Sequence, residues 1–323
     1  MPVFLRKCAA VCMAAVLSLV TVGCLDWEED IPPEEQGNAS DTYTLMLYMC
    51  ASDLESECGF ATEDLNEIMY GYTAGNLNVI VQTGGTAEWQ NTVVADDRCQ
   101  RYRVTEDGLE LVDDSLGMQN MADSATLTDF IQYCSSNYAA DHYGLVLWDH
   151  GGGSTGVCFD ETANYDSLTI HEVNDALHDY SQQNPDFHLD IVGFDACLMA
   201  TYEMAVHMAQ YADYMVASEE LEPGIGWNYL GWLSDLANDT GMDSADIAVS
   251  IADNFMSACL EDNPNDYLSQ SVMNLAALPA FRDQLETYAA YLSDALSNGQ
   301  LPTISRSRQR MYSFGKFSDA SSD

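Results

Sequence analysis

Two residues capable of covalent catalysis each follow an apolar segment of the sequence. Leu-Val-Leu-Trp-Asp leads into His150 and three glycines, and Leu-Asp-Ile-Val-Gly-Phe-Asp-Ala leads into Cys197. Both segments have the apolar character of buried strands. In open α/β sheets the active crevice lies at the carboxyl ends of the strands. We therefore expect the His150 imidazole and the Cys197 thiol to meet at one edge of a sheet.

A thiol and an imidazole at such an edge can together carry out acyl transfer. We expect Cys197 to stand at the start of a helix over residues 198–211, where the helix dipole lowers the pKa of a thiol. His150 can serve as general acid and base, and the glycines after it let backbone N–H groups approach a developing oxyanion. A single buried cysteine is more often part of the core. The pairing of the two residues at matching strand ends favours catalysis.

The elements that must position these residues alternate between strand-like and helix-like patterns. This alternation is typical of an α/β protein with a largely parallel sheet. A strand pair over 101–112 should turn at Asp107-Gly108, and the box Thr169-Ile-His-Glu172 should start a helix. Further strands are predicted at 43–49, 78–82, 143–148, 189–194, 214–218 and 310–314, and further helices at 57–70, 126–138, 244–260 and 278–296.

Composition limits the class of protein. The chain has 323 residues, 47% of them apolar, which is enough for a substantial core. Its 52 acidic and 10 basic residues give a net charge of −42, so its surface would repel nucleic acids and we expect no nucleic-acid partner. The histidines show no metallopeptidase spacing such as His-Glu-x-x-His.

The N-terminus has the pattern of an export signal. Arg6-Lys7 precede an apolar run that ends at Gly23-Cys24, and Thr-Val-Gly-Cys24 resembles a bacterial lipobox in which Cys24 is acylated. Ordinary signal cleavage is the alternative. We expect a signal peptide over 1–24, an acidic tether over 25–42, a core over 43–235 and a helical C-terminal part of the same domain over 236–323. Whether this C-terminal part is truncated is left open. The protein should be extracytoplasmic, either secreted or anchored to the membrane by lipid.

Four ordered motifs resemble those of the clostripain-like cysteine peptidases, relatives of caspases, gingipains and legumains. The motifs occupy residues 48–55, 148–151, 195–199 and 218–227. The resemblance implies a caspase-like three-layer α/β fold, with a largely parallel central sheet flanked by helices and helical additions toward the C-terminus. It also implies an endopeptidase of peptide or protein substrates, in which Cys197 forms a thioester, His150 is the general acid and base, and the amides of Gly151 and Cys197 form the oxyanion hole.

The resemblance also indicates residues that bind substrate. Asp195 matches a position in the pocket for the residue before the scissile bond, although capping a helix or bonding a loop amide is equally compatible. Ile225 stands where relatives specific for basic residues can carry Asp, so a preference for Arg or Lys would rest on Asp195. No Lys or Arg lies between Arg103 and Arg282, so either the enzyme does not process itself in the loop between the two catalytic motifs or its specificity is not for basic residues. The downstream pocket segment contributes Ser218, Glu219, Ile225 and Trp227.

The sequence also gives expectations for the cofactor, the oligomeric state and an alternative function. The chemistry requires no cofactor and no metal ligand can be assigned, but Asp160, Glu161 and Asp166 offer oxygen atoms suited to calcium in an otherwise plain acidic loop. We expect a monomer. The alternative function is that of a catalytically weak or inactive relative that binds peptides at the cell surface as a lipoprotein.

Overall fold

The computed structural model describes residues 41–265 and 267–315. The expected signal peptide, the lipidation site Cys24 and nearly all of the expected tether therefore lie outside the described residues. Within the described part of the chain, no helix combines the length and apolar character needed to cross a membrane.

One eight-stranded sheet forms the centre of the fold, in the order β10-β9-β8-β5-β1-β2-β3-β4. The five strands from β9 to β2 run parallel, and the remaining three pair antiparallel at the two edges. The largely parallel sheet predicted from the sequence is thus confirmed. The strands are β1 Tyr43–Cys50, β2 Leu77–Gly84, β3 Gln100–Thr105, β4 Gly108–Asp113, β5 His142–Trp148, β8 Leu189–Asp195, β9 Ala212–Ala217 and β10 Ser271–Asn274.

The parallel strands are buried on both faces. In β1 every residue is buried: Leu45 and Leu47 point into one apolar cluster, and Met46 and Tyr48 point into the other. Side chains alternate between the faces of a strand, so a strand covered by helices on both sides reads as a continuous apolar run. This explains why the central strands were recognisable in the sequence.

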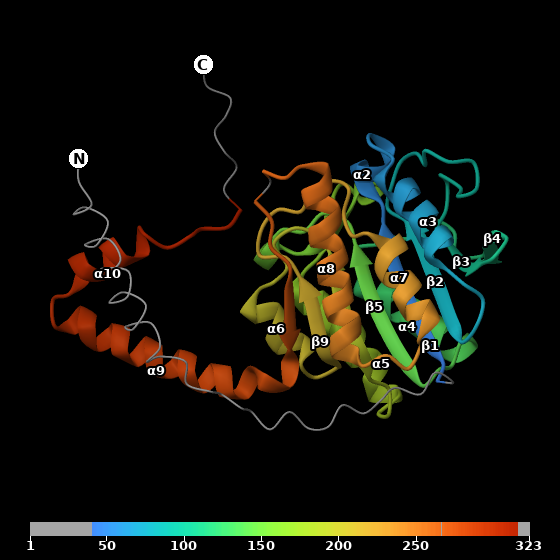
Figure 1. The fold of residues 1–323 in the computed structure, drawn as a ribbon. Helices are drawn as coiled ribbons and strands as arrows, with labels where there is room; N and C mark the ends of the chain where they lie inside the picture. Colours follow the sequence, from blue (N-terminus) through green and yellow to red (C-terminus); the bar gives the residue numbers. More distant parts are fainter. Residues whose placement is uncertain (1–40, 266, 316–323) are drawn as a thin grey trace, which may run out of the picture. The chain divides into compact units, whose positions relative to one another are not determined.

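Helices cover both faces and give the fold three layers. Helices α3, α7 and α8 bury their apolar sides on the face that is turned toward the viewer in Figure 1, and α4, α5 and α6 cover the opposite face. Two small strands, β6 Val157–Asp160 and β7 Asp166–Leu168, form a separate hairpin. The helices are α2 Ser52–Ser56, α3 Phe60–Gly71, α4 Ser124–Asn137, α5 Ile170–Gln183, α6 Tyr202–Met208, α7 Tyr229–Asn238, α8 Ser244–Asp262, α9 Leu278–Ser297 and α10 Leu301–Arg308.

Two sequence-based predictions of secondary structure are wrong. The helix expected over 198–211 is shorter and begins at Tyr202, with Thr201 as its N-cap. The strand expected over 310–314 does not form. By contrast, the capping box at Thr169 and Glu172 opens α5 as predicted. Helix α7 spans the expected boundary at residue 235, and β10 from the C-terminal part joins the central sheet.

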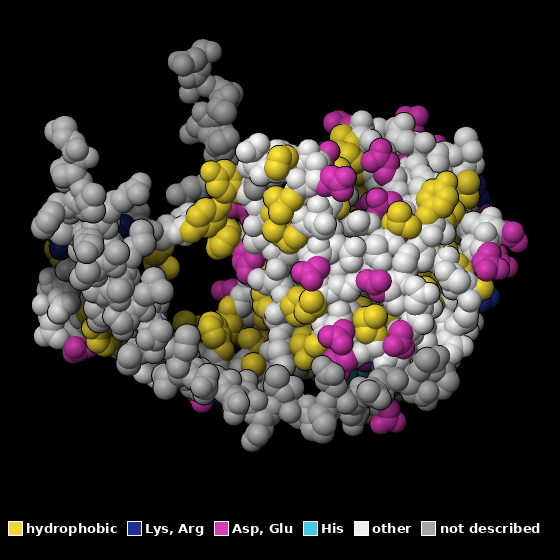
Figure 2. Space-filling model, viewed as in Figure 1, with side chains coloured by type: hydrophobic (Ala, Val, Ile, Leu, Met, Phe, Trp, Pro, Cys, Tyr) yellow, Lys and Arg dark blue, Asp and Glu magenta, His cyan; other side chains and the backbone are white. Residues whose placement is uncertain are grey.

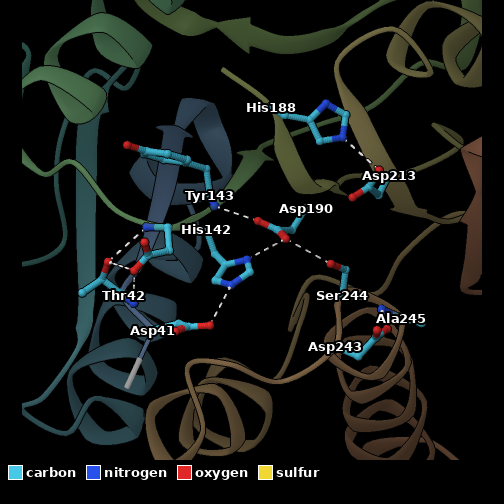
Figure 3. Close-up of polar contacts among 11 residues, drawn as sticks. Asp41, Thr42, His142, Tyr143, His188, Asp190, Asp213, Asp243, Ser244 and Ala245 are labelled. Atoms are coloured by element: carbon cyan, nitrogen blue, oxygen red, sulfur yellow. Dashed lines mark hydrogen bonds and ion pairs between the residues drawn. The ribbon is translucent and has the colours of Figure 1, made fainter. Parts of the chain in front are cut away.

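A polar cluster stands at the amino ends of the parallel strands, opposite the edge where catalysis is expected (Figure 3). His142 Nδ1 lies 2.9 Å from Asp190 Oδ1 and its Nε2 lies 3.7 Å from Asp41 Oδ2. Nearby, His188 Nε2 lies 2.9 Å from Asp213 Oδ1. Each of these two histidines therefore has a carboxylate partner at this end of the sheet.

Candidate active site

The parallel register places the two catalytic candidates at one edge of the sheet. Strands β5 and β8 are neighbours, with Trp148 opposite Asp195 at their carboxyl ends. His150 and Cys197 each lie two residues beyond this pair, and both line one cavity of about 420 Å³. The fold therefore places His150 and Cys197 at the same edge of the sheet and on the same cavity. The cavity is lined by Leu54, Trp148, Asp149, His150, Gly151, Asp195, Ala196, Cys197, Leu221, Glu222, Pro223, Gly224 and Gly226.

Gly151 lies directly against the loop that carries Cys197. A Cβ atom at residue 151 would be 2.1 Å from the Cys197 carbonyl oxygen and 3.0 Å from the Cys197 amide nitrogen. Hydrogen bonds from Cys158 N to His150 O and from Gly152 N to Gly156 O bracket Gly151 and leave its own N–H out of the pairing. The backbone of Gly151 thus packs directly against that of Cys197, and the N–H of Gly151 is left out of the pairing with β6.

His150 has a carboxylate partner that sequence reasoning missed. Its Nε2 lies 2.9 Å from Oδ1 of Asp53, in the short helix α2 that follows β1. A histidine whose one nitrogen donates to a carboxylate presents the other nitrogen, here Nδ1, as the proton acceptor. Asp53 is thus placed where an orienting group would stand if His150 acts as the base for Cys197. The motif at 48–55 was noted in the sequence, but no role was given to Asp53.

The residue before the histidine fixes the loop around it. Asp149 is buried, and its carboxylate accepts hydrogen bonds from Ser52 Oγ and from Phe159 N. Burial is the main cause that raises the pKa of Asp149 well above its ordinary value. One side chain therefore joins the end of β5 to the start of α2 and to the β6 strand.

The environment of Cys197 differs from the sequence-based expectation. Leu198 adopts a left-handed conformation with φ of 65°, and α6 begins only at Tyr202. Cys197 is therefore not the first residue of a helix, and the predicted lowering of its pKa by a helix dipole is wrong. Burial raises the pKa of the thiol, as do the charges of Glu222 and Asp195, while the hydrogen bond of 3.1 Å from Glu222 N to Sγ acts against them. Cys197 is a free thiol.

Among the expected substrate-binding residues, Asp195 lines the cavity. Its carboxylate accepts hydrogen bonds from Tyr229 Oη at 2.8 Å and from Trp227 N at 3.4 Å, so it lines the pocket and also bonds a loop amide. Thr201, rather than Asp195, caps the following helix. Burial is the main cause that raises the pKa of Asp195 to about 7.

The other four expected residues are not among the described residues that line the cavity. Ser218 is buried and bonds Glu220 and Ser269, and Glu219 accepts a hydrogen bond from Ser271. Trp227 is fully buried beneath the pocket, and Ile225 packs against the same apolar cluster. These side chains shape the segment rather than face the cavity.

Two carboxylates near the cavity were not singled out from the sequence. Glu222 lines the cavity, and Asp64 of α3 lies behind Gly226, beside Asp195. Burial and then the charge of Asp195 raise the pKa values of both groups well above their ordinary range. Asp64 had a recognisable signal, since it stands among Ala61, Leu65 and Ile68 on the apolar side of its helix. A carboxylate in such a position usually has a specific partner.

The acidic loop proposed for calcium makes other contacts. Asp160 is buried and accepts hydrogen bonds from Met121 N, Thr162 N and Ala163 N, while Glu161 accepts from Ser56 and Ala87. In the described part of the chain, no group of three or more His, Cys, Asp or Glu side chains could hold a metal ion. Calcium binding stays a prediction that this geometry does not support.

Comparisons with known proteins agree with the site. Residues 47–319 match the clostripain family, Peptidase_C11. Clostripain from Hathewaya histolytica is 28% identical over 238 residues, which cover 62% of this chain and 43% of clostripain, so the chain spans less than half of that relative.

Solved structures show the same fold. A secreted C11 cysteine protease from Bacteroides thetaiotaomicron, bound to an irreversible peptide inhibitor, is 24% identical with a TM-score of 0.59, covering 74% of this chain and 68% of that one. An inactive zymogen C11 protease from Parabacteroides distasonis is 25% identical with a TM-score of 0.56, covering 74% and 63%. The predicted caspase-like architecture is confirmed, and the chain belongs to the clostripain family.

Proposed function

We propose that this protein is a cysteine endopeptidase that uses Cys197 as nucleophile and His150 as general acid and base. The observation that carries the proposal is the convergence of Cys197, His150, Gly151 and Asp195 on one cavity. The family relationship supports the same chemistry. A peptide or protein is the substrate, and the reaction needs no cofactor.

The proposed reaction begins with a neutral thiol, because burial raises the pKa of Cys197. His150 accepts the thiol proton at Nδ1, since its Nε2 is bound to Asp53. The sulfur attacks the peptide carbonyl carbon, and the oxyanion is stabilised by the amides of Gly151 and Cys197. His150 then donates its proton to the leaving amine, and the C–N bond breaks to leave a thioester. Water, deprotonated by His150, hydrolyses the thioester and restores the thiol.

The cavity favours a basic side chain before the scissile bond. Its lining includes the carboxylates of Asp195 and Glu222 and contains no Lys or Arg among the described residues. An Arg or Lys side chain would supply the missing positive charge. Figure 2 shows acidic side chains scattered over the visible face of the described residues, with few Lys or Arg side chains among them, and the whole chain carries a net charge of −42. This field would attract basic substrates.

The proposed location is outside the cytoplasm, with lipid attached to Cys24 and the catalytic domain acting as a monomer. The signal-like N-terminus supports export, and one structural relative is described as secreted. Detergent phase partitioning tests the anchor: the exported wild-type protein should enter the detergent phase, and a Cys24→Ser variant the aqueous phase. Light scattering of the catalytic domain tests the monomer.

A fluorogenic peptide library with each residue before the scissile bond tests the activity, run with calcium and with a chelator. We expect cleavage after Arg or Lys, and loss of activity on the order of 10⁴-fold or more in Cys197→Ala. A peptidyl acyloxymethyl ketone should label Cys197, more slowly in His150→Ala. Binding of peptides without cleavage or labelling would favour the alternative peptide-binding function.

A further inference from the structure

Two acidic side chains that line the cavity, Asp195 and Glu222, lie close to a third, Asp64, and we call this group the acidic pocket. Asp195 ends β8, Glu222 belongs to the loop after β9, and Asp64 belongs to α3. Asp195 and Asp64 are each only 4% exposed. A Cβ atom at Gly226 would lie 3.1 Å from Asp195 Oδ1 and 3.5 Å from Asp64 Oδ2, so this glycine lets the loop close over both carboxylates.

The three carboxylates differ in how they are held. Asp195 accepts hydrogen bonds from Tyr229 Oη and Trp227 N, and Asp64 accepts one of 2.6 Å from Trp148 Nε1. Glu222 hydrogen-bonds the side chains of Asp195 and Trp227, but one of its two oxygens, Oε2, is shielded from solvent and has no hydrogen-bond partner among the described residues. A buried carboxylate oxygen without a donor is costly unless a partner arrives. Glu222 therefore has the capacity to accept a donor from a ligand in the cavity.

The groups that surround Glu222 carry no positive charge. The titratable groups that change the pKa values of the acidic pocket through charge or hydrogen bonds include Asp195 from β8 and Tyr229 from α7. Glu67 and Glu63, on the same helix as Asp64, also act through their charges. Cys197 is also close, since Glu222 N donates to its sulfur. Two adjacent buried carboxyl groups without a cation cannot both ionise easily, and they retain a proton between them.

We propose that Glu222 determines specificity by sharing a proton with Asp195 in the free protein and exchanging it for the basic side chain of the substrate. This inference rests on the proposed peptidase function and adds the residue and the mechanism of selection. The charges balance: two carboxylates and one proton carry −1, and two carboxylates with one guanidinium also carry −1. The proton is released to solvent, so the pocket accepts a cation without a change in its net charge.

Because of this exchange, the protein can select a substrate with a basic side chain without an acidic residue at position 225. Ile225 packs into the apolar cluster, whereas Glu222 lines the cavity three residues earlier. The backbone N–H of Glu222 also bonds the Cys197 sulfur. Glu222→Gln keeps this N–H and nearly the same side-chain shape, so it removes the charge without removing the support of the nucleophile.

The first experiment compares matched peptides with arginine or its neutral isostere citrulline before the scissile bond. In Glu222→Gln, the ratio of kcat/KM for arginine over citrulline should fall by about tenfold or more, mainly through KM. Glu203→Gln, which removes one exposed charge on α6, should keep the wild-type ratio. An unchanged ratio in Glu222→Gln would overturn the role of this residue.

The second experiment counts protons without requiring turnover. The arginine peptide is titrated into Cys197→Ala by calorimetry in two buffers of different ionisation enthalpy, near pH 6. About one proton should be released per peptide bound, and fewer in the Cys197→Ala, Glu222→Gln double variant. Binding without proton release would refute the exchange. If the wild-type protein cleaves no peptide but the Cys197→Ala protein still releases a proton on binding, the peptidase proposal fails while the pocket mechanism stands.

Discussion

The contact between Asp53 and His150 allows a direct test of the catalytic arrangement. Replacing Asp53 by Asn removes the charge and keeps the shape, and replacing it by Ala removes the hydrogen bond as well. Asp53 acts only through His150, so we regard it as a positioning residue. We expect both variants to fold, because the Asp53 side chain is partly exposed and belongs to the short helix α2.

The expected loss can be worked out from the geometry. The Nε2–Oδ1 distance of 2.9 Å is that of a good hydrogen bond, while the side chains of His150 and Asp53 are 41% and 32% exposed. A charge-assisted hydrogen bond contributes about 1.5–3 kcal/mol, and partial exposure places this one near the lower value. A loss of about 1.4 kcal/mol lowers a rate tenfold. We therefore expect kcat/KM to fall by about tenfold in Asp53→Asn and somewhat more in Asp53→Ala.

The assay is kcat/KM on the arginine peptide as a function of pH, together with the rate of Cys197 alkylation by iodoacetamide. A merely structural role would leave the shape of the pH profile unchanged, whereas loss of the His150 partner should alter it. Asp213→Asn is a matched control, because His188 and Asp213 form a contact of the same length at the opposite edge of the sheet. Wild-type activity in both Asp53 variants would refute the role assigned to this carboxylate.

Three further predictions follow from close contacts and from charge. Gly151→Ala should lower peptide hydrolysis per titrated thiol by on the order of 10²-fold or more, since its Cβ would meet the Cys197 carbonyl at 2.1 Å; a wild-type rate would contradict the proposed oxyanion site. Gly193→Ala should reduce the free energy of unfolding in urea by about 1–3 kcal/mol, because its Cβ would lie 2.6 Å from the Trp227 ring, and equal stability would show that the ring can move. Burial lowers the pKa of His142, but its neighbours Asp190 and Asp41 outweigh burial and raise the pKa overall. Protonated His142 therefore stabilises the folded protein at low pH, and this stabilisation is lost as pH rises through the folded-state pKa. His142→Gln should therefore destabilise the protein more at about pH 5.5 than at about pH 8.5 in thermal unfolding, and an equal effect at both would count against the linkage.

The fold and the placement of His150 and Cys197 on one cavity were predictable because their signals are local. The central strands are apolar throughout, and His150 and Cys197 stand immediately after two of them. The parallel arrangement then requires the two residues to share an edge, whatever the details of the loops. The α6 boundary was less predictable, since the apolar residues after Cys197 fit a helix, but Leu198 turns the chain and delays the helix to Tyr202.

The partners of the catalytic residues depend on long-range folding. Asp53 and His150 are 97 residues apart in sequence, and Asp64 and Trp148 are 84 apart. No local pattern relates such pairs. Glu222 lies within a motif that the sequence did identify, but Ser218 and Glu219 in the same motif turn away from the cavity. The direction of each side chain in an irregular loop is set by its contacts, and periodicity gives no guide to it.

The lack of a side chain at Gly193 lets the Trp227 ring lie directly on the central sheet, next to Asp195, which lines the cavity. The inner wall of the cavity is thus continuous with the interior that keeps the chain folded. A substitution in this wall would destabilise the folded protein more than it would change substrate selectivity. Divergence in substrate choice within such a scaffold should therefore accumulate at Leu221, Glu222 and Pro223, which line the cavity from a loop, and not at Gly224, where a Cβ atom would lie 2.4 Å from the Phe60 ring.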